Sequence, residues 1–220
     1  YLAQQGGGLS DSMFNENPFQ SNRSRNWFNI NWLLFQTKIK HSFSDNSKLD
    51  IQLFGLNAQR DALGYRTNRV SAVDPNSYRD LISGKFKNYG IETKWLNELN
   101  IFGKKIIFLL GGKWYSTQNT SNQGPGSTGN GPDFKFYTFE NPNYSYQSNY
   151  SYPNKNLALF SEQIFYLNKK ISISPGVRYE YINTRANGNY KKINLDGAGN
   201  VIQDQILLEN QQNKRSFFLF

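Results

Sequence analysis

One pattern repeats along the chain: a segment that alternates apolar and polar residues, a very short polar turn, a second such segment, and then a long polar stretch. The clearest segment is 35–43, with Phe35, Ile39 and Phe43 on one side and Lys38 and Lys40 on the other. A period of two residues places successive side chains on opposite faces of a β-strand. The pattern therefore predicts antiparallel hairpins that have one apolar and one polar face.

Three hairpins are predicted in this way. They pair 35–43 with 49–53 through a turn at 44–47, 88–95 with 106–115 through a turn at 100–104, and 157–166 with 171–181 through a turn at 168–170. A seventh strand is predicted to begin at Ser216. Residues 106–115 are apolar at nearly every position, so the sequence leaves open which of their side chains share a face.

The connections between the hairpins are much longer than ordinary hairpin loops. We predict loops at 57–87, 116–155 and 183–214, and a further loop-like segment before the first strand. Because consecutive strands run antiparallel, all the long connections lie at the same end of the sheet. We expect them to form one surface, and long loops on a rigid sheet commonly carry function.

Strand length and aromatic placement both favour a membrane protein. About ten residues of tilted strand cross the hydrocarbon layer, and only a closed sheet satisfies every backbone group there. Aromatic residues flank the predicted strands at both ends, as in the girdles of membrane barrels: Phe43, Trp95 and Tyr166 beside the short turns, and Trp27, Trp32, Tyr89, Trp114, Tyr179 and Tyr181 toward the long loops. Each aromatic taken singly also suits a soluble β-sandwich, in which it would form a cross-strand pair.

Taken together, these features predict an all-β fold, namely part of a transmembrane antiparallel β-barrel in the cell outer membrane. The sheet is expected to be a meander of hairpins with short periplasmic turns and long extracellular loops. Residues 1–5 have neither the basic head nor the apolar core of a signal peptide. Since six or seven strands cannot close around loops this large, we expect residues 1–220 to be an incomplete barrel domain.

Composition narrows the classes of function. No apolar run reaches the length of a transmembrane helix, and the absence of cysteine excludes disulfides, thiolate metal sites and a cysteine nucleophile. The formal charge is +9, from 25 Lys and Arg against 16 Asp and Glu. These cations are spread over turns, strands and loops rather than gathered in a stripe, so we do not expect the protein to bind nucleic acid. Scattered charge suits a polar lumen, lipopolysaccharide phosphates or an anionic solute.

Three stretches resemble TonB-dependent outer-membrane receptors, especially the ferric-citrate type. They are Gln4-Gln5-Gly6-Gly7-Gly8-Leu9-Ser10-Asp11, then 20–28 (QSNRSRNWF), and 161–180, where an apolar strand and short turn precede Pro175-Gly176-Val177-Arg178-Tyr179-Glu180. The resemblance covers essentially the whole chain as an interior section of the barrel. It implies a plug domain, which these residues do not include, and import of a ferric chelate powered through TonB.

Arginines are the expected ligand-binding residues, because an iron chelate such as ferric citrate is anionic and guanidinium groups bind carboxylates in a bidentate manner. The candidates are Arg23 and Arg25 in the opening segment, and Arg60, Arg66, Arg69 and Arg79 in the first long loop. A solvated loop charge or a lipopolysaccharide contact is the alternative for each of them. We expect no metal site and no cofactor, since iron would enter only within the transported chelate.

Two other functions remain open on the sequence alone, namely a passive outer-membrane pore and an adhesive or merely structural barrel portion. We expect no enzyme, because the only histidine, His41, lies at the short-turn end, away from the outer rim where a barrel hydrolase would need it. The segment 196–200 faintly resembles a calcium loop but lacks its acidic ligands. The repeated Asn-Tyr-Ser-Tyr at 143–146 and 149–152 indicates an adhesive aromatic loop.

Overall fold

The computed structural model describes residues 1–67 and 69–220, which form one antiparallel sheet. The long strands are β2 (Trp27–Ser44), β3 (Ser47–Gly64), β4 (Asp80–Ile101), β5 (Lys104–Pro125), β6 (Ser148–Tyr166), β8 (Gly176–Leu195) and β9 (Val201–Leu219). Three short elements complete the described chain: β1 (Leu2–Gln4), α1 (Asp11–Glu16) and β7 (Ser172–Ile173). None of the described helices could span a membrane.

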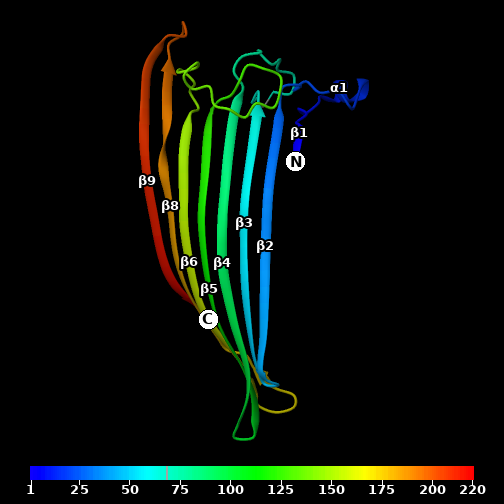
Figure 1. Ribbon diagram of the computed structural model, residues 1–220, viewed down its shortest axis with the longest axis vertical. Coiled ribbons are helices and arrows are strands. Elements are labelled where there is room, and N and C mark those ends of the chain that lie inside the picture. The colour runs from blue at the N-terminus through cyan, green and yellow to red at the C-terminus, as the bar shows by residue number, and fades with distance from the viewer. Residues whose placement is uncertain (68) are drawn as a thin grey trace.

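Each strand pairs with the next along the chain, in the order β1-β2-β3-β4-β5-β6-β8-β9, and β7 pairs with β6. The sheet is therefore a meander whose two edges are β1 and β9, and its long strands run side by side (Figure 1). The fold class predicted from the sequence, an all-β meander of an incomplete barrel, is confirmed. The short turns at 44–47, 100–104 and 168–170 also lie where the sequence predicts them.

The strands extend well beyond their predicted ends, so the predicted bounds of all three long loops are wrong. The long connections shrink to 65–79 and 126–147, while the predicted loop 183–214 is mostly a hairpin of β8 and β9 with a turn at 196–200. The last strand accordingly begins at Val201 rather than at Ser216. The opening segment is not all loop, since β1 pairs with β2 and α1 lies between them.

These errors have one physical cause. Beyond the apolar part of each strand, both faces carry Asn, Gln, Ser, Thr and Tyr, so the alternation that marks a strand disappears from the sequence. The backbone ladder continues regardless of side chains: Asn119 pairs with Phe86 and Tyr152, and Thr184 pairs with Asn213. Hydrogen bonds between backbones, rather than an apolar face, hold this part of the sheet.

Strand register gives the sheet an apolar face over its middle. One transverse row runs across Ile39, Ile51, Thr93, Gly112, Leu159, Tyr179 and Phe218. The register also settles the facing of 106–115, because Trp114 lies between Ile91 and Leu157 on this apolar face. The large side chains of the apolar face are exposed: Ile39 and Leu159 are each 52% exposed. An apolar face left uncovered over several strands needs an apolar medium or a partner.

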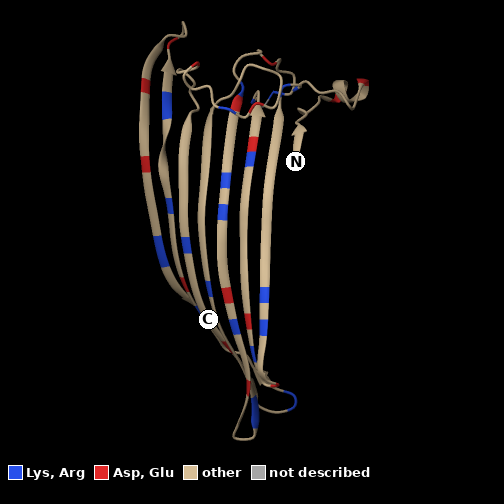
Figure 2. Ribbon diagram, in the orientation of Figure 1, with Lys and Arg blue, Asp and Glu red and all other residues tan. Residues whose placement is uncertain are grey.

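The opposite, polar face carries the charges of the middle of the sheet. A row just beside the apolar one runs across Lys40, Asp50, Lys94, Gly111, Phe160 and Arg178. Lys38 pairs with Asp50 at 2.9 Å and Arg178 with Glu180 at 2.6 Å, while the Lys113 ammonium lies 5.4 Å from the centroid of the Phe54 ring. Figure 2 shows that these charges recur along the strands rather than gather in one stripe.

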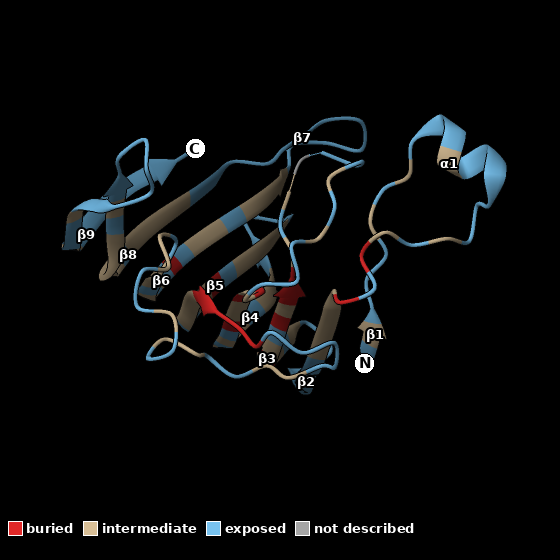
Figure 3. Ribbon diagram, turned by 90° about the horizontal axis from the view of Figure 1, so that it is seen from above, coloured by how far each residue is buried: buried red, intermediate tan, exposed pale blue. Residues whose placement is uncertain are grey.

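The tightly packed part of the molecule lies at the loop end of the sheet. Leu63, Leu81, Pro125 and Arg79 are each less than 2% exposed. Seen from above, the buried segments gather where the loops cross the ends of β3 and β5 (Figure 3). The sheet is thus open on both faces along its length and closed over only at the end that carries the long loops.

Candidate functional site

The loop end brings together three segments that are far apart in the sequence: residues 5–26, loop 65–79 and loop 126–147. The Trp27 indole donates to the carbonyl of Asn130 at 2.6 Å, and the Asn22 amide donates to the carbonyl of Val70. Loop 126–147 returns to β4, where the Tyr144 hydroxyl donates to the carboxylate of Asp80. The three segments therefore form one interlocked unit on top of the sheet.

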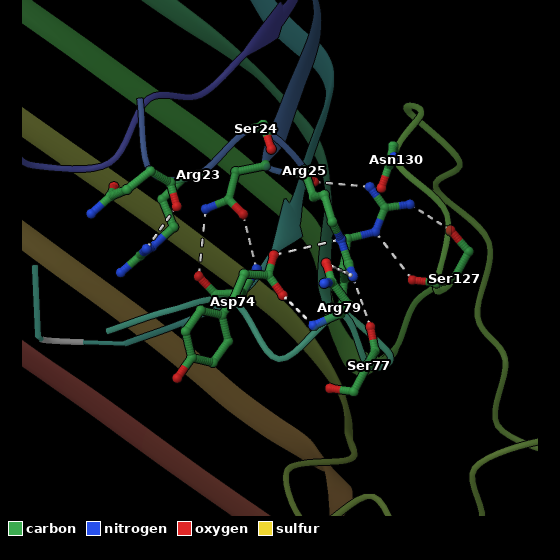
Figure 4. Close-up of polar contacts among 12 residues, drawn as sticks. Arg23, Ser24, Arg25, Asp74, Ser77, Arg79, Ser127 and Asn130 are labelled. Atoms are coloured by element: carbon green, nitrogen blue, oxygen red, sulfur yellow. Dashed lines mark hydrogen bonds and ion pairs between the residues drawn. The ribbon is translucent and has the colours of Figure 1, made fainter. Parts of the chain in front are cut away.

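Arg79 holds this unit together. Its guanidinium donates to the carbonyls of Ser127 at 3.1 Å, Arg25 at 2.9 Å and Gly131 at 2.9 Å, and to the Ser127 hydroxyl at 2.5 Å (Figure 4). One side chain thus joins residues from all three segments. Burial lowers the pKa of Arg79, and the nearby charge of Arg25 lowers it further.

Arg23 and Arg25 play a similar part on the neighbouring loop. Arg25 donates to the Ser77 carbonyl at 2.7 Å and lies 3.5 Å from the Asp74 carboxylate. Arg23 donates to the carbonyls of Asn22 and Ala72 at 2.8 Å and of Arg69 at 3.1 Å. Both residues are 4% exposed. We call Arg23, Arg25 and Arg79 the arginine clamp, because most of their donors already bind protein oxygens.

The other predicted ligand residues are exposed. Arg66 and Arg69 lie in loop 65–79, as predicted, with their side chains in solvent. Arg60 does not lie in a loop, because β3 continues through it to Gly64. It stands near the loop end of β3, on the polar face, with its guanidinium 5.9 Å from the centroid of the Phe86 ring. The six predicted arginines therefore divide into a buried clamp and an exposed group.

Aromatic residues extend the surface beside Arg60, and they are not among the ligand residues predicted from the sequence. Strand register places Arg60, Gly84, Ser121 and Tyr150 in one row across four strands. Tyr152 stacks on Tyr150, with ring centroids 6.0 Å apart. This second copy of the Asn-Tyr-Ser-Tyr repeat belongs to β6 rather than to a loop. We call Arg60, Phe86, Tyr150 and Tyr152 the upper polar wall.

The upper polar wall also contains acceptors and donors suited to a polar ligand. The Asn119 carboxamide oxygen lies in the row of Phe86 and Tyr152, and it is buried without a hydrogen-bond partner. The Tyr150 hydroxyl donates to the Glu209 carboxylate at 2.7 Å. Signals for this wall were present in the sequence as the tyrosine repeat, but only strand register shows that its second copy shares a face with Arg60.

The described residues contain no group of His, Cys, Asp or Glu that could hold a metal ion. The Asp196 carboxylate accepts from the backbone of Ala198 at 2.9 Å and of Asn200 at 2.8 Å, which closes the turn between β8 and β9. A hydrogen bond from the Asn200 carboxamide at 2.9 Å lowers the pKa of Asp196, and the bonds from the backbone of Asn200 and Ala198 lower it further. His41 lies on β2 near the turn end, 4.6 Å from the Phe43 ring.

Comparison with known proteins supports the fold. No family model and no curated protein matches the chain. Among solved structures, the unliganded ferric citrate transporter FecA is similar over 100% of this chain, with a TM-score of 0.63 and 16% sequence identity. The chain spans 29% of the length of that protein. At this identity the likeness shows a shared arrangement of strands.

Proposed function

We propose that this chain forms part of the wall of a TonB-dependent outer-membrane receptor that imports a ferric chelate. The observation that carries the proposal is the division of the loop end into a buried clamp and an exposed cationic and aromatic surface. The clamp gives the loops a fixed shape, and Arg60, Arg66 and Arg69 present free donors beside it. Likeness to a ferric citrate transporter supports the same class of ligand.

The two faces of the sheet fit this placement. The exposed apolar face would contact lipid, and the polar face, with Lys38, Asp50 and Glu180, would line the interior of the barrel. Long loops would then point out of the cell and short turns into the periplasm. Arg60 and Tyr150 would face the upper lumen, on the route of a solute that enters from outside.

Ligand capture in this scheme is electrostatic. An anionic iron chelate offers carboxylate or similar oxygens, to which arginine donates two parallel hydrogen bonds, while tyrosine adds a hydroxyl and a flat apolar surface. Iron is cargo here and not a resident cofactor. Release into the periplasm would need the plug domain and the TonB complex, both supplied by other parts of the receptor and its partners.

The test is chelate binding by the full-length receptor that contains this segment. Replacing Arg60 and Arg66 together by alanine should weaken the binding of ferric citrate or a ferric siderophore by about tenfold or more, since hydrogen bonds from charged groups contribute about 1.5–3 kcal/mol each. The Lys169→Ala, Lys170→Ala variant removes the same charge at the turn end and serves as the control. Unchanged affinity in the arginine variant would remove both residues from the site, and unsaturable passage of solute through both variants would favour a passive pore.

A further inference from the structure

The ladder between β6 and β8 is interrupted at one point. Residues 152–154 of β6 and 184–186 of β8 form no ladder pairs, although the register is the same on both sides of this gap. Pro153 lies in the middle of the gap, and proline has no N–H with which to continue a ladder. The backbone amide of Arg185, opposite Pro153, donates instead to the Asn154 carboxamide oxygen at 3.1 Å. A proline in an interior strand thus opens the sheet locally.

A groove of about 640 Å³ lies at this gap, among the neighbouring strands β6, β8 and β9. Strand alternation places the side chains of six of its lining residues on the polar face of the sheet. They are Tyr152, Asn154, Thr184, Ala186, Gln211 and Asn213. By the same alternation the other two, Arg185 and Gln212, lie on the opposite face. The groove therefore belongs to the polar face, and its volume is within the range of about 300–1,000 Å³ that is usual for small-molecule sites.

The side chains that line the groove on this face are all uncharged. Thr184, Gln211 and Asn213 are exposed, so their polar groups are accessible to a ligand. The nearest charges on the same face of β9 are one alternate position beyond either end of the groove, and both bind within the protein. Glu209 accepts from the Tyr150 hydroxyl at 2.7 Å, and Arg215 donates to the Asn213 carboxamide at 3.3 Å.

A flat aromatic surface borders the groove. The Tyr152 ring stacks on the Tyr150 ring, with centroids 6.0 Å apart and an angle of 16° between the ring planes. Because the Tyr150 hydroxyl is bound to Glu209, this pair has a fixed position. The groove therefore combines a flat apolar surface with several carboxamides. That combination fits a sugar ring, which has an apolar C–H face and a rim of hydroxyls.

We propose that this groove binds a neutral oligosaccharide. A sugar ring would lie against Tyr152, and its hydroxyls would form hydrogen bonds with Asn154, Gln211 and Asn213. A carboxamide both donates and accepts, as a hydroxyl does, so the two groups satisfy each other without the burial of a charge. An anionic ligand would find no cation in this lining. The inference is independent of the proposed function, because the exposed arginines of the chelate site take no part in it.

The experiment measures the binding of maltohexaose, cellohexaose and xylohexaose, each separately, to the purified full-length receptor in a detergent without a sugar headgroup. The groove variant is Gln211→Ala with Asn213→Ala. Its control is Asn187→Ala with Asn210→Ala, a cross-strand pair of carboxamides on the opposite face of β8 and β9. We expect saturable binding of at least one sugar, a loss of about tenfold in the groove variant and less than about twofold in the control. Binding should change little with salt concentration, since no charge contributes to it.

Two results would overturn the proposal: no saturable binding of any of the three sugars, or equal losses in the groove variant and its control. If the groove variant fails to fold, Tyr152→Ala takes its place and should lose about tenfold, while Tyr152→Phe, which keeps the ring, should lose less than about threefold. Equal losses in these two variants would exclude stacking of the sugar on Tyr152.

Ferric citrate binding is measured on the same samples and should be unchanged in the Gln211→Ala, Asn213→Ala variant. A receptor that binds a sugar in this manner but binds no ferric chelate would refute the proposed function and leave the sugar groove standing. A receptor that binds the chelate but none of the sugars would refute the groove and leave the proposed function standing.

Discussion

Arg79 shows why residue type alone does not define a ligand site. This residue is 1% exposed, and its guanidinium donates to Ser127, Arg25 and Gly131, so its hydrogen bonds hold the loops together. Arg60, which has the same chemistry, is exposed beside Phe86. The sequence predicts that arginines gather near one end of the sheet. It does not predict which of them donate to carbonyl oxygens of their own chain, because those contacts depend on how distant loops fold.

Removing the Arg79 side chain should loosen the loops without affecting the strands. Arg79→Ala would remove four hydrogen bonds and leave the buried carbonyl of Arg25 without a donor, at a cost of about 1–3 kcal/mol for that group alone, and we expect loop 126–147 to be cleaved much faster by a protease of broad specificity. Lys135→Ala, an exposed change in the same loop, is the control. Equal cleavage rates in Arg79→Ala and wild type would show that the clamp does not fix the loops.

Tyr144 makes the attachment of loop 126–147 sensitive to high pH. Burial, followed by its hydrogen bond to Asp80, strongly raises the pKa of this phenol. A raised pKa in the folded state means that the attached loop holds its proton more tightly than the detached loop. The protonated Tyr144 hydroxyl therefore stabilises the attached loop fully below pH about 10, the pKa of a free tyrosine. This stabilisation is lost as the pH rises above that value.

We predict that the wild-type loop becomes sensitive to protease above pH about 10, whereas Tyr144→Phe shows a uniformly higher sensitivity with little dependence on pH in that range. Tyr146→Phe keeps the hydrogen bond to Asp80 and should behave as wild type. Cleavage rates measured at several pH values, with corrections for the activity of the protease, decide the matter. A Tyr144→Phe variant with the wild-type pH profile would contradict this assignment.

At the scale of the strand, the period-two pattern predicts the middle of each hairpin and fails toward the loops. Residues 35–43 and 49–53 alternate clearly and lie within β2 and β3. Residues 201–215 lack that alternation, yet they pair with β8 over nearly their whole length. The pattern marks a strand with one apolar face, so it disappears where both faces are polar although the backbone ladder persists.

Glycines opposite aromatic rings help to fix the register of neighbouring strands. The rings of Phe35, Phe54 and Phe160 lie over Gly55, Gly90 and Gly111 respectively, in space that a Cβ atom would occupy. Aromatic rings that cover cross-strand glycines bury the exposed backbone of a sheet. Pairs of this kind occur between β2 and β3, β3 and β4, and β5 and β6.

Gly111→Val should lower the free energy of unfolding by about 1–3 kcal/mol, because the valine side chain would overlap the Phe160 ring. The matched control is Gly112→Val, since a Cβ atom there first meets Leu159 at an ordinary distance of 3.4 Å. Adding Phe160→Ala to Gly111→Val should restore part of the loss by making room. Urea unfolding of the receptor in detergent tests all three, and equal midpoints for the two valine variants would refute the packing argument.

For the whole molecule, the sequence predicts the meander, its apolar face and the common end of its loops. The structure adds the arginine clamp and the upper polar wall, which depend on contacts between segments up to about half the chain apart, such as Arg25 with Arg79 and Trp27 with Asn130. Fold likeness to FecA joins these features to a known architecture. The import of a ferric chelate is the proposal that accounts for all of them together.

The most direct test is the binding and uptake of iron-55 citrate, with ferric siderophores as competitors, by cells that produce the full-length receptor, before and after collapse of the proton gradient. We predict saturable binding that survives the collapse and uptake that stops with it, because in the proposed function capture needs only the outer surface whereas import needs TonB. Absence of saturable binding, with solute entry that continues after the collapse, would contradict energised import and indicate a passive pore.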